Sequence, residues 1–322
     1  MSTTTNDVTG SAVNASAPII RRVRAYFSPV DRTSPAPVPF DTAQSGRFDL
    51  ESPPAPWVDL GWVDNFTRKS TSEIGPLAAG APAMSVVQVR HKVDAWVSLR
   101  FLHWGKLQMA LAAGSDHWNL IAPPGQSGTD AVSLATGSTA TALMMSVTDA
   151  AEFSCGQAIA VDVDYSGQTG YVGSGASSAY VGNARALQED LNYVRRVTLN
   201  VAQVAAVNGN CVHLTAPLVA GAPSSAMRVQ PVNGFMDREG GTFFQEWSAL
   251  FVMQGEEGER ILYNYPRLQA MKGGQEATQP VAGTLKMICL TAEFRALPVR
   301  DGRDGQPTLC YRSFLPGTGM PL

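Results

Sequence analysis

The sequence predicts a mainly β protein, a β-sandwich or barrel that assembles with other subunits. Residues 57–66 read Trp-Val-Asp-Leu-Gly-Trp-Val-Asp-Asn-Phe, which alternates like a half-buried strand and repeats Trp-Val-Asp within itself. Residues 283–297 form a second long strand pattern, which runs into Pro298 and a turn-rich segment. Because no catalytic motif accompanies these strands, they favour a structural protein built for contact.

Composition supports this interpretation. A chain of 322 residues with 44% hydrophobic residues can bury a sizeable core. Charged residues make up 16%, below the usual quarter or so, whereas Gly (30) and Pro (21) are plentiful. So little surface charge favours permanent contacts with other subunits. The net charge of −3 argues against a nucleic-acid-binding domain, because phosphates require a concentrated basic patch.

Cysteine usage and hydropathy indicate the compartment. The four cysteines are scattered, no Cys-x-x-Cys occurs, and the N-terminus lacks the hydrophobic region of a signal peptide. We therefore expect reduced thiols and cytoplasmic synthesis. No apolar run approaches the roughly 20 residues that span a bilayer, so no membrane segment is expected.

Residues 1–56 are predicted to form an N-terminal extended arm. The first 18 residues are small and polar, and the rest of the segment combines many prolines with aromatic side chains, including Tyr26 and Phe27. Proline stiffens an extended chain, and the aromatic residues would anchor it on another surface. A disordered linker is the alternative. We expect Tyr26 and Phe27 to contact a neighbouring subunit.

Residues 57–154 are expected to form the first part of the main β domain. After the first strand, residues 69–82 are polar and contain Gly and Pro, which predicts a long loop with a function. Ile74 and Leu77 in this loop have charged neighbours, a combination typical of an interface. The intersubunit contacts expected in this part are Trp57, Trp62, Ile74 and Leu77.

A strand and then a helix follow this loop. Residues 84–101 alternate, with apolar residues at every odd position from Val93 to Phe101, which predicts a strand with one face in the core. From Leu102 the spacing becomes helical and ends at Gly114, a typical helix C-cap. We therefore expect one helix beside the sheet.

The remaining chain is predicted as an inserted module and a return to the main domain. Residues 155–240 are loop-rich, and Asn208-Gly209 between apolar runs predicts a β-hairpin. The low-complexity stretch 165–184 could not form a core by itself. Further strands, assigned to the second part of the main domain at residues 241–322, are expected at 242–253, 260–271 and 284–297, with an acidic turn at 254–259.

Candidate chemistry is weak throughout the sequence. The four histidines lack metal-ligand spacing, and the Gly-rich segments match neither a phosphate-binding loop nor a nucleophile elbow. Asp162 and Asp164 could bind calcium or act as paired acids, although a solvated strand face is the favoured interpretation. The tryptophans could form a carbohydrate platform, but a core or an interface is favoured. We expect no enzyme, cofactor or metal.

Several of these segments resemble the major tail tube proteins of tailed bacteriophages. The residues that carry the resemblance are Trp57–Val63 with Asp59-Leu60-Gly61, residues 93–114, Tyr263-Asn-Tyr-Pro-Arg267, and the closing strand 290–297 before a short Asp-Gly turn. The resemblance covers about half of the chain, residues 57–122 and 242–314.

The resemblance implies a β-sandwich or barrel with one flanking helix, whose subunits form rings, commonly of six, stacked into a hollow tube that DNA passes through. Partners would be copies of the chain and other tail proteins, in a virion tail made in a bacterial host's cytoplasm. Residues 155–240 depart from the compact family pattern. The alternatives are a related phage-like tube, a capsid-decorating or baseplate protein, or a carbohydrate-active enzyme using acids such as Glu152 or Glu246.

Overall fold

The computed structural model of the protein describes residues 18–30, 37–54, 56–121, 131–163, 201–218, 221–239, 246–271 and 274–317. These residues fold into antiparallel sheets with three short helices, α1 (Thr42–Ser45), α2 (Lys106–Ala113) and α3 (Val147–Ala150). The predicted mainly β fold is confirmed. Within the same ranges, no helix is long and apolar enough to cross a membrane.

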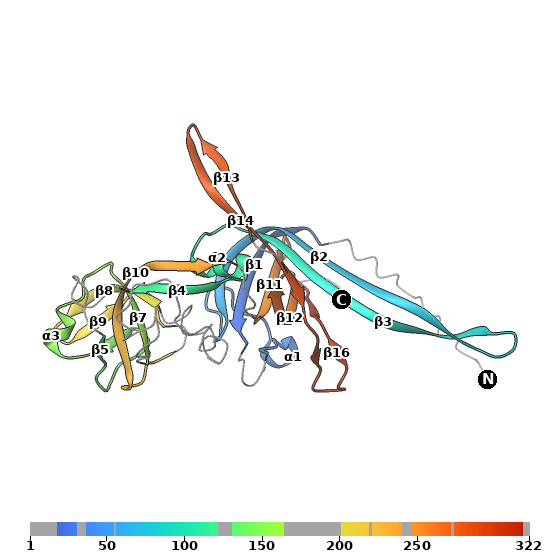
Figure 1. The fold of residues 1–322 in the computed structure, drawn as a ribbon, viewed down its shortest axis with the longest axis horizontal. Coiled ribbons are helices and arrows are strands. Elements are labelled where there is room, and N and C mark those ends of the chain that lie inside the picture. The colour runs from blue at the N-terminus through green and yellow to red at the C-terminus, as the bar shows by residue number, and fades with distance from the viewer. Residues whose placement is uncertain are drawn as a thin grey trace, which may run out of the picture.

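The larger sheet has eight strands in the order β13-β14-β3-β2-β1-β11-β12-β17 (Figure 1). Their bounds are β1 Ile20–Pro29, β2 Val58–Ala79, β3 Met84–Phe101, β11 Glu246–Gly255, β12 Arg260–Ala270, β13 Gln275–Ala282, β14 Leu285–Ala296 and β17 Tyr311–Leu315. Strand β12 also pairs with β14, for example at Leu268 and Ala296. This pairing joins the two ends of the run from β14 to β12. A separate short pair follows β14, β15 (Val299–Arg300) with β16 (Pro307–Thr308).

The main core lies on one face of this sheet and is closed by α2. Alternate residues of β3 from Ala95 to Phe101 are buried, as the sequence pattern predicts. Leu111 and Ala112 of α2 pack into the same core. The helix ends at Gly114, which has a φ of +61°, so the predicted glycine C-cap is confirmed.

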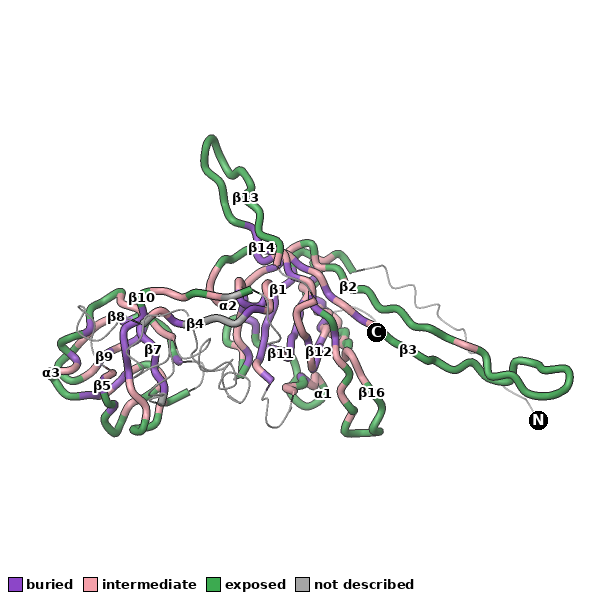
Figure 2. Tube along the Cα trace, in the orientation of Figure 1, coloured by how far each residue is buried: buried purple, intermediate pink, exposed green. Residues whose placement is uncertain are grey.

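The other face of β1, β11 and β12 carries a second core, formed by the proline-rich segment. Phe40 and Phe48 pack with Tyr26 of β1 and Leu250 of β11, and Figure 2 shows how much of β1 is buried. The predicted arm therefore needs correction in its described part. Residues 20–29 are an inner strand of the sheet, and residues 37–54 contribute their aromatic side chains to the chain's own core because β1 offers an apolar face.

A smaller sheet contains seven strands in the order β4-β10-β7-β8-β9-β6, with β5 beside β10. Their bounds are β4 Asp116–Ile121, β5 Val132–Ser133, β6 Ala142–Met144, β7 Ala158–Val163, β8 Val201–Asn208, β9 Cys211–Leu214 and β10 Met227–Arg238. Its own core includes Leu143, Val161 and Val212. The Asn208-Gly209 hairpin is confirmed, whereas the low-complexity stretch 165–184 lies outside the described residues. This sheet takes strands from both sides of the boundary predicted at residue 155.

Candidate assembly surfaces

A long hairpin, β2–β3, extends well beyond the body of the molecule (Figure 1). Its strands pair from Val63 and Phe101 outward to Ala79 and Met84. In the inner part, alternate residues of β3 are buried, but almost all residues from 71 to 93 are exposed (Figure 2). At about 3.3 Å per residue, this outer part is roughly 30 Å long. An isolated two-stranded ribbon of this kind has little stability of its own in water.

The prediction of a loop at residues 69–82 is wrong, because strand β2 continues to Ala79. The turn itself occupies residues 80–83, where Gly80 adopts a φ of +98°. Gly75, Pro76 and several Ser and Thr residues give β2 the composition of a loop. Since neither face of this ribbon covers a core, the strand also lacks the alternation that a half-buried strand would show.

Cross-strand pairing gives the outer hairpin two chemically different faces. Leu77 lies opposite Val87, and Gly75 lies opposite Val89. The two pairs are two positions apart along each strand, so the side chains of Leu77, Val87 and Val89 lie on one face. We call Leu77, Val87 and Val89 the hairpin's apolar face; their exposed fractions are 58%, 53% and 39%. The imidazole of His91 packs over Gly75, which has no side chain in its way. A Cβ atom at position 75 would lie 2.5 Å from His91 Nε2.

Ile74 lies on the opposite face of the hairpin. It pairs with Arg90, and Pro76 pairs with Gln88 on the same side. Ile74 is 53% exposed. Ile74 and Leu77 are thus both available to a partner, as an interface requires, but they point to different sides of the ribbon and do not form one contact patch.

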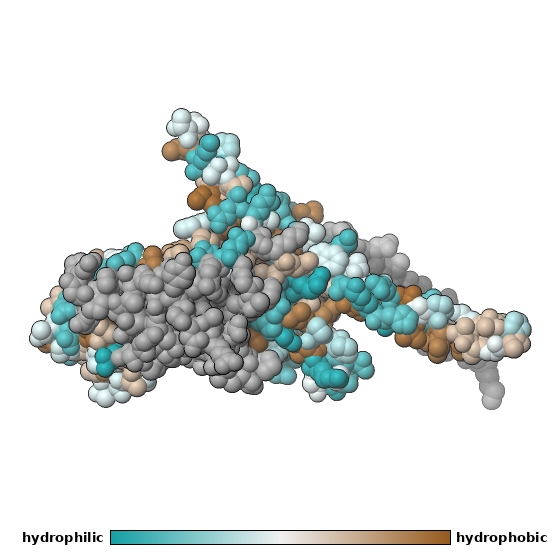
Figure 3. Space-filling model, in the orientation of Figure 1, coloured by the Kyte–Doolittle hydropathy of each residue, from teal (hydrophilic) through white to brown (hydrophobic). Residues whose placement is uncertain are grey.

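A second hairpin, β13–β14, also projects from the body with apolar side chains exposed. Val281, Leu285, Met287 and Ile288 have exposed fractions between 41% and 67%. Strand β13 forms an end of the larger sheet's strand order, and all its residues are exposed. Apolar colour is visible on both projecting hairpins in Figure 3. Exposed apolar strands at a sheet edge recruit further strands unless something covers them.

Three of the predicted contact residues belong to the subunit's own core. Tyr26 and Phe27 are fully buried, and Trp57 is 5% exposed. The Tyr26 hydroxyl donates to the Leu50 carbonyl at 2.9 Å, and Trp57 packs edge-on against Phe48. These side chains have no surface left for a partner. Their assignment as intersubunit contacts is corrected, because β1 lies inside the sheet and both its faces are covered.

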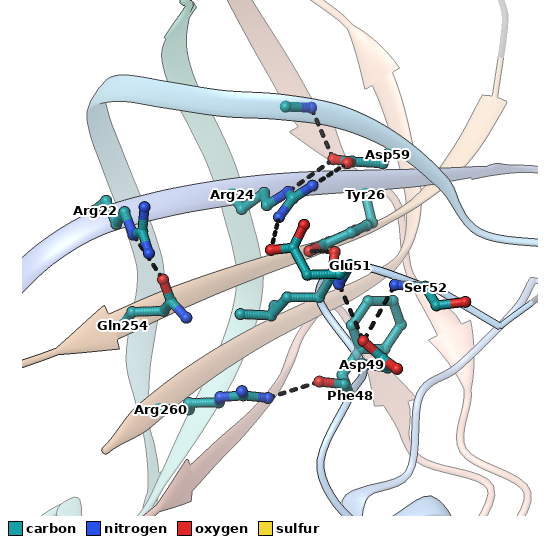
Figure 4. A network of polar contacts seen from close by, with 12 residues as sticks. Arg22, Arg24, Tyr26, Phe48, Asp49, Glu51, Ser52, Asp59, Gln254 and Arg260 are labelled. Carbon is teal, nitrogen blue, oxygen red and sulfur yellow. Dashed lines mark hydrogen bonds and ion pairs between the residues drawn. The ribbon is translucent and has the colours of Figure 1, made fainter. Parts of the chain in front are cut away.

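Trp62 lies beside a polar network on the surface of the sheet that includes Arg22 and Arg24. Figure 4 shows Arg22, Arg24, Glu51 and Asp59 of this network. The guanidinium groups of Arg22 and Arg24 lie 4.2 and 5.0 Å from the Trp62 ring centroid. Arg24 is held by both carboxylate oxygens of Asp59 and by Glu51 at 2.8 Å. The hydrogen bonds that Arg24 donates to Asp59 raise the pKa of Arg24 above its usual value. Trp62 is half-buried, and the subunit's own cations cover part of its ring.

The Asp59-Leu60-Gly61 motif has a structural explanation. Asp59 accepts a hydrogen bond from the backbone N–H of Gly61 at 2.8 Å. Gly61 has a φ of +83°, and a Cβ atom there would collide with the imidazole of His103. The motif thus bends β2 beside β1, where the pairing register shifts.

A half-buried lysine joins α2 to the smaller sheet. Lys106, the first residue of α2, donates a hydrogen bond from Nζ to Asn119 Oδ1 on β4. Burial lowers the pKa of Lys106 to about 7. Sequence reasoning did not single out this residue. Its position at the start of an amphipathic helix gave no sign that it would be covered.

The candidate acids are engaged or lie apart. Glu246 is bonded to Arg267 at 2.8 Å through both of its carboxylate oxygens. Asp162 is buried and has a partner, Glu152 is exposed, and Asp164 lies outside the described residues. Across the described ranges, no group of three or more His, Cys, Asp or Glu residues could hold a metal ion.

Comparisons with known proteins do not assign the chain to a family. No protein-family model matches the sequence, and no curated protein matches it significantly. Function is therefore inferred from the fold and from its exposed hairpins.

Proposed function

We propose that this chain is a structural virion protein that self-assembles into stacked rings, forming a phage tail tube that conducts DNA. The outer part of the β2–β3 hairpin carries the proposal. It presents the apolar face of Leu77, Val87 and Val89 with no core beneath it. Such a ribbon is stabilised when a partner covers its apolar side chains, and other copies of the chain are present wherever the protein is made.

The shape of the subunit supports rings over a simple pair. The two hairpins leave the body in different directions (Figure 1). A hairpin that docks on another part of the next copy makes a heterologous contact, which repeats until a ring closes or a filament grows. Covering the exposed edge at β13 would also remove a site of unspecific aggregation.

The strand pairing supports a tube protein in particular. The run from β14 to β12 has its ends joined, and α2 packs beside it. This arrangement fits the barrel with one flanking helix that the sequence resemblance implies. The net charge of −3 is compatible with a channel for DNA, because a strongly basic wall would hold phosphates and slow their passage.

Light scattering and negative-stain microscopy of the purified full chain test this function. We expect rings or hollow tubes at micromolar concentration. The triple variant Leu77→Ser, Val87→Ser, Val89→Ser should remain folded by circular dichroism but lose assembly, because each fully buried side chain of this size contributes roughly 1.5–3 kcal/mol to an interface. Gln88→Ser, on the same strand but the opposite face, is the matched control and should assemble normally.

Two outcomes would contradict the proposal. A monomer of 34.2 kDa at every concentration would exclude self-assembly through the hairpins. Normal tubes from the triple variant would show that its apolar face is not the contact. Small closed oligomers without tubes would instead favour a capsid-decorating or baseplate protein.

A further inference from the structure

A cationic cleft lies where the inner and outer parts of the β2–β3 hairpin meet, against the C-terminal segment. Its volume is about 670 Å³. The basic residues that line it are Arg68, Arg90, His91, Lys92 and Arg312. No Asp or Glu is among the described residues that line it, so the cleft concentrates positive charge in a chain whose net charge is −3.

Most of this charge is not neutralised within the subunit. Lys92 pairs with Asp94 at 3.1 Å and with Glu73 at 3.4 Å. Arg90 and Arg312 are exposed and form no ion pair with any residue the structure describes. Arg68 Nε is buried without a hydrogen-bond partner in the described part, and its guanidinium lies 5.8 Å from the Tyr263 ring centroid.

An acidic cleft lies where α2 meets the end of β10 and the start of β13. Its volume is about 450 Å³, and it is lined by the carboxylates of Asp237, Glu239 and Glu276. Among its described lining residues there is no Lys, Arg or His. Ser115 Oγ donates to Asp237 Oδ2 at 2.8 Å. Glu239 and Glu276 are exposed, and neither pairs with a described cation.

The two clefts lie toward opposite ends of the buried stretch of β3. Ala95 of β3 lines the cationic cleft. Phe101, at the other end of this stretch, pairs with Leu290, which lines the acidic cleft. The distance along the strand between Ala95 and Phe101 is roughly 20 Å. The subunit therefore carries a positive cleft and a negative cleft that are separated along the direction of β3.

We infer that successive copies of this chain join head to tail, with Arg90 and Arg312 of one copy facing Glu239 and Glu276 of the next. This inference rests on the proposed self-assembly, and it adds the direction in which neighbouring copies are arranged. Opposite charges on different patches favour a heterologous contact that repeats in one direction. They also disfavour the head-to-head and tail-to-tail arrangements, in which like charges would meet.

Charge reversal tests the pairing. The variant Arg90→Glu/Arg312→Glu removes the net positive charge of the cationic cleft, because only Arg68 and Lys92 remain against the two new carboxylates. The variant Glu239→Lys/Glu276→Lys makes the acidic cleft basic, because only Asp237 remains. Each should stay folded, since the four side chains are exposed, and each should lose tubes in favour of single rings or short stacks. The quadruple variant exchanges the two charges and should recover tubes of wild-type length. Wild-type tubes should shorten at 1 M NaCl, where the Debye length falls to about 3 Å.

Negative-stain length distributions and sedimentation separate the outcomes. The inference is overturned if either double variant elongates like wild type, or if a folded quadruple variant fails to recover tubes. In both cases wild-type tubes would leave the proposed function standing. A wild-type chain that never assembles would overturn the proposed function as well. Recovery by the quadruple variant alone identifies the four residues as one contact.

Discussion

Replacing Phe27 by alanine tests whether β1 is a core strand of the subunit or an arm that serves assembly. Phe27 is fully buried, and its ring centroid lies between 5.6 and 6.4 Å from those of Phe294, Phe251 and Trp247. Truncating a buried phenylalanine costs about 3–5 kcal/mol, because the lost transfer free energy adds to the cost of the cavity. Domains are typically stable by about 5–15 kcal/mol, so the variant should lose a large share of its stability.

Urea unfolding of dilute protein, followed by tryptophan fluorescence, measures this loss. The signal includes Trp247, which packs against Phe27. Leu77→Ala is the matched control, because Leu77 is 58% exposed on the outer hairpin. It should change the free energy of subunit unfolding by no more than about 0.5 kcal/mol. If Phe27→Ala changed stability by less than about 1 kcal/mol and still abolished assembly, β1 would be an arm, and its placement as an inner strand would be refuted.

Two further predictions concern single residues. Gly61→Ala should lower the free energy of unfolding by about 1–2 kcal/mol because of the positive φ at this position, and by more because the new Cβ atom collides with His103. Adding His103→Ala should recover the part of the loss that comes from the collision. An unchanged urea midpoint for Gly61→Ala would contradict the strain expected at Gly61. Burial lowers the pKa of Lys106 to about 7, whereas an unfolded lysine titrates near 10.4. The unfolded state then binds more protons between these values, so stability should rise from pH 7 toward pH 9. Lys106→Met should flatten this rise in stability with pH. If the free energy of unfolding changed with pH in parallel in the two proteins, the lowered pKa of Lys106 would be disproved.

The parts of the fold that follow local rules could be predicted from the sequence. Strand β3 shows clear alternation because one of its faces packs on the core from Ala95 to Phe101. Helix α2 has a glycine C-cap, and the β8–β9 hairpin turns at Gly209-Asn210, directly after Asn208. In each case the local chemistry and the tertiary contacts favour the same conformation.

The parts that depend on distant partners could not be predicted. Strand β1 contains Arg21, Arg22 and Arg24 and is followed by many prolines, so its composition resembled an arm. It becomes a strand because β11, far along the chain, pairs with it over its whole length. Tertiary pairing overrides a weak local signal.

The contact face of the outer hairpin was hidden from the sequence for a different reason. Pairing is regular from Ile74 to Leu77, so these two residues, three positions apart, lie on opposite faces of the strand. The loop expected at residues 69–82 left no strand along which this alternation could be counted. Exposure at Ile74 and Leu77 agrees with an interface, whereas their opposite orientation follows only once β2 is seen to continue to Ala79.

The order of strands in the larger sheet has a consequence for the time course of folding. Strand β1 pairs with β11, and its residue Arg22 bonds to Gln254 across 232 positions of the chain. The β2–β3 hairpin, in contrast, pairs neighbours in sequence. At a synthesis rate of about 5–20 residues per second, the ribosome needs roughly 10–40 s to deliver β11 after β1. Contacts with such large sequence separation also form slowly once both strands exist. The β2–β3 hairpin is thus synthesised well before β11 and β12, and its apolar face is present on the chain before the strands that complete the sheet.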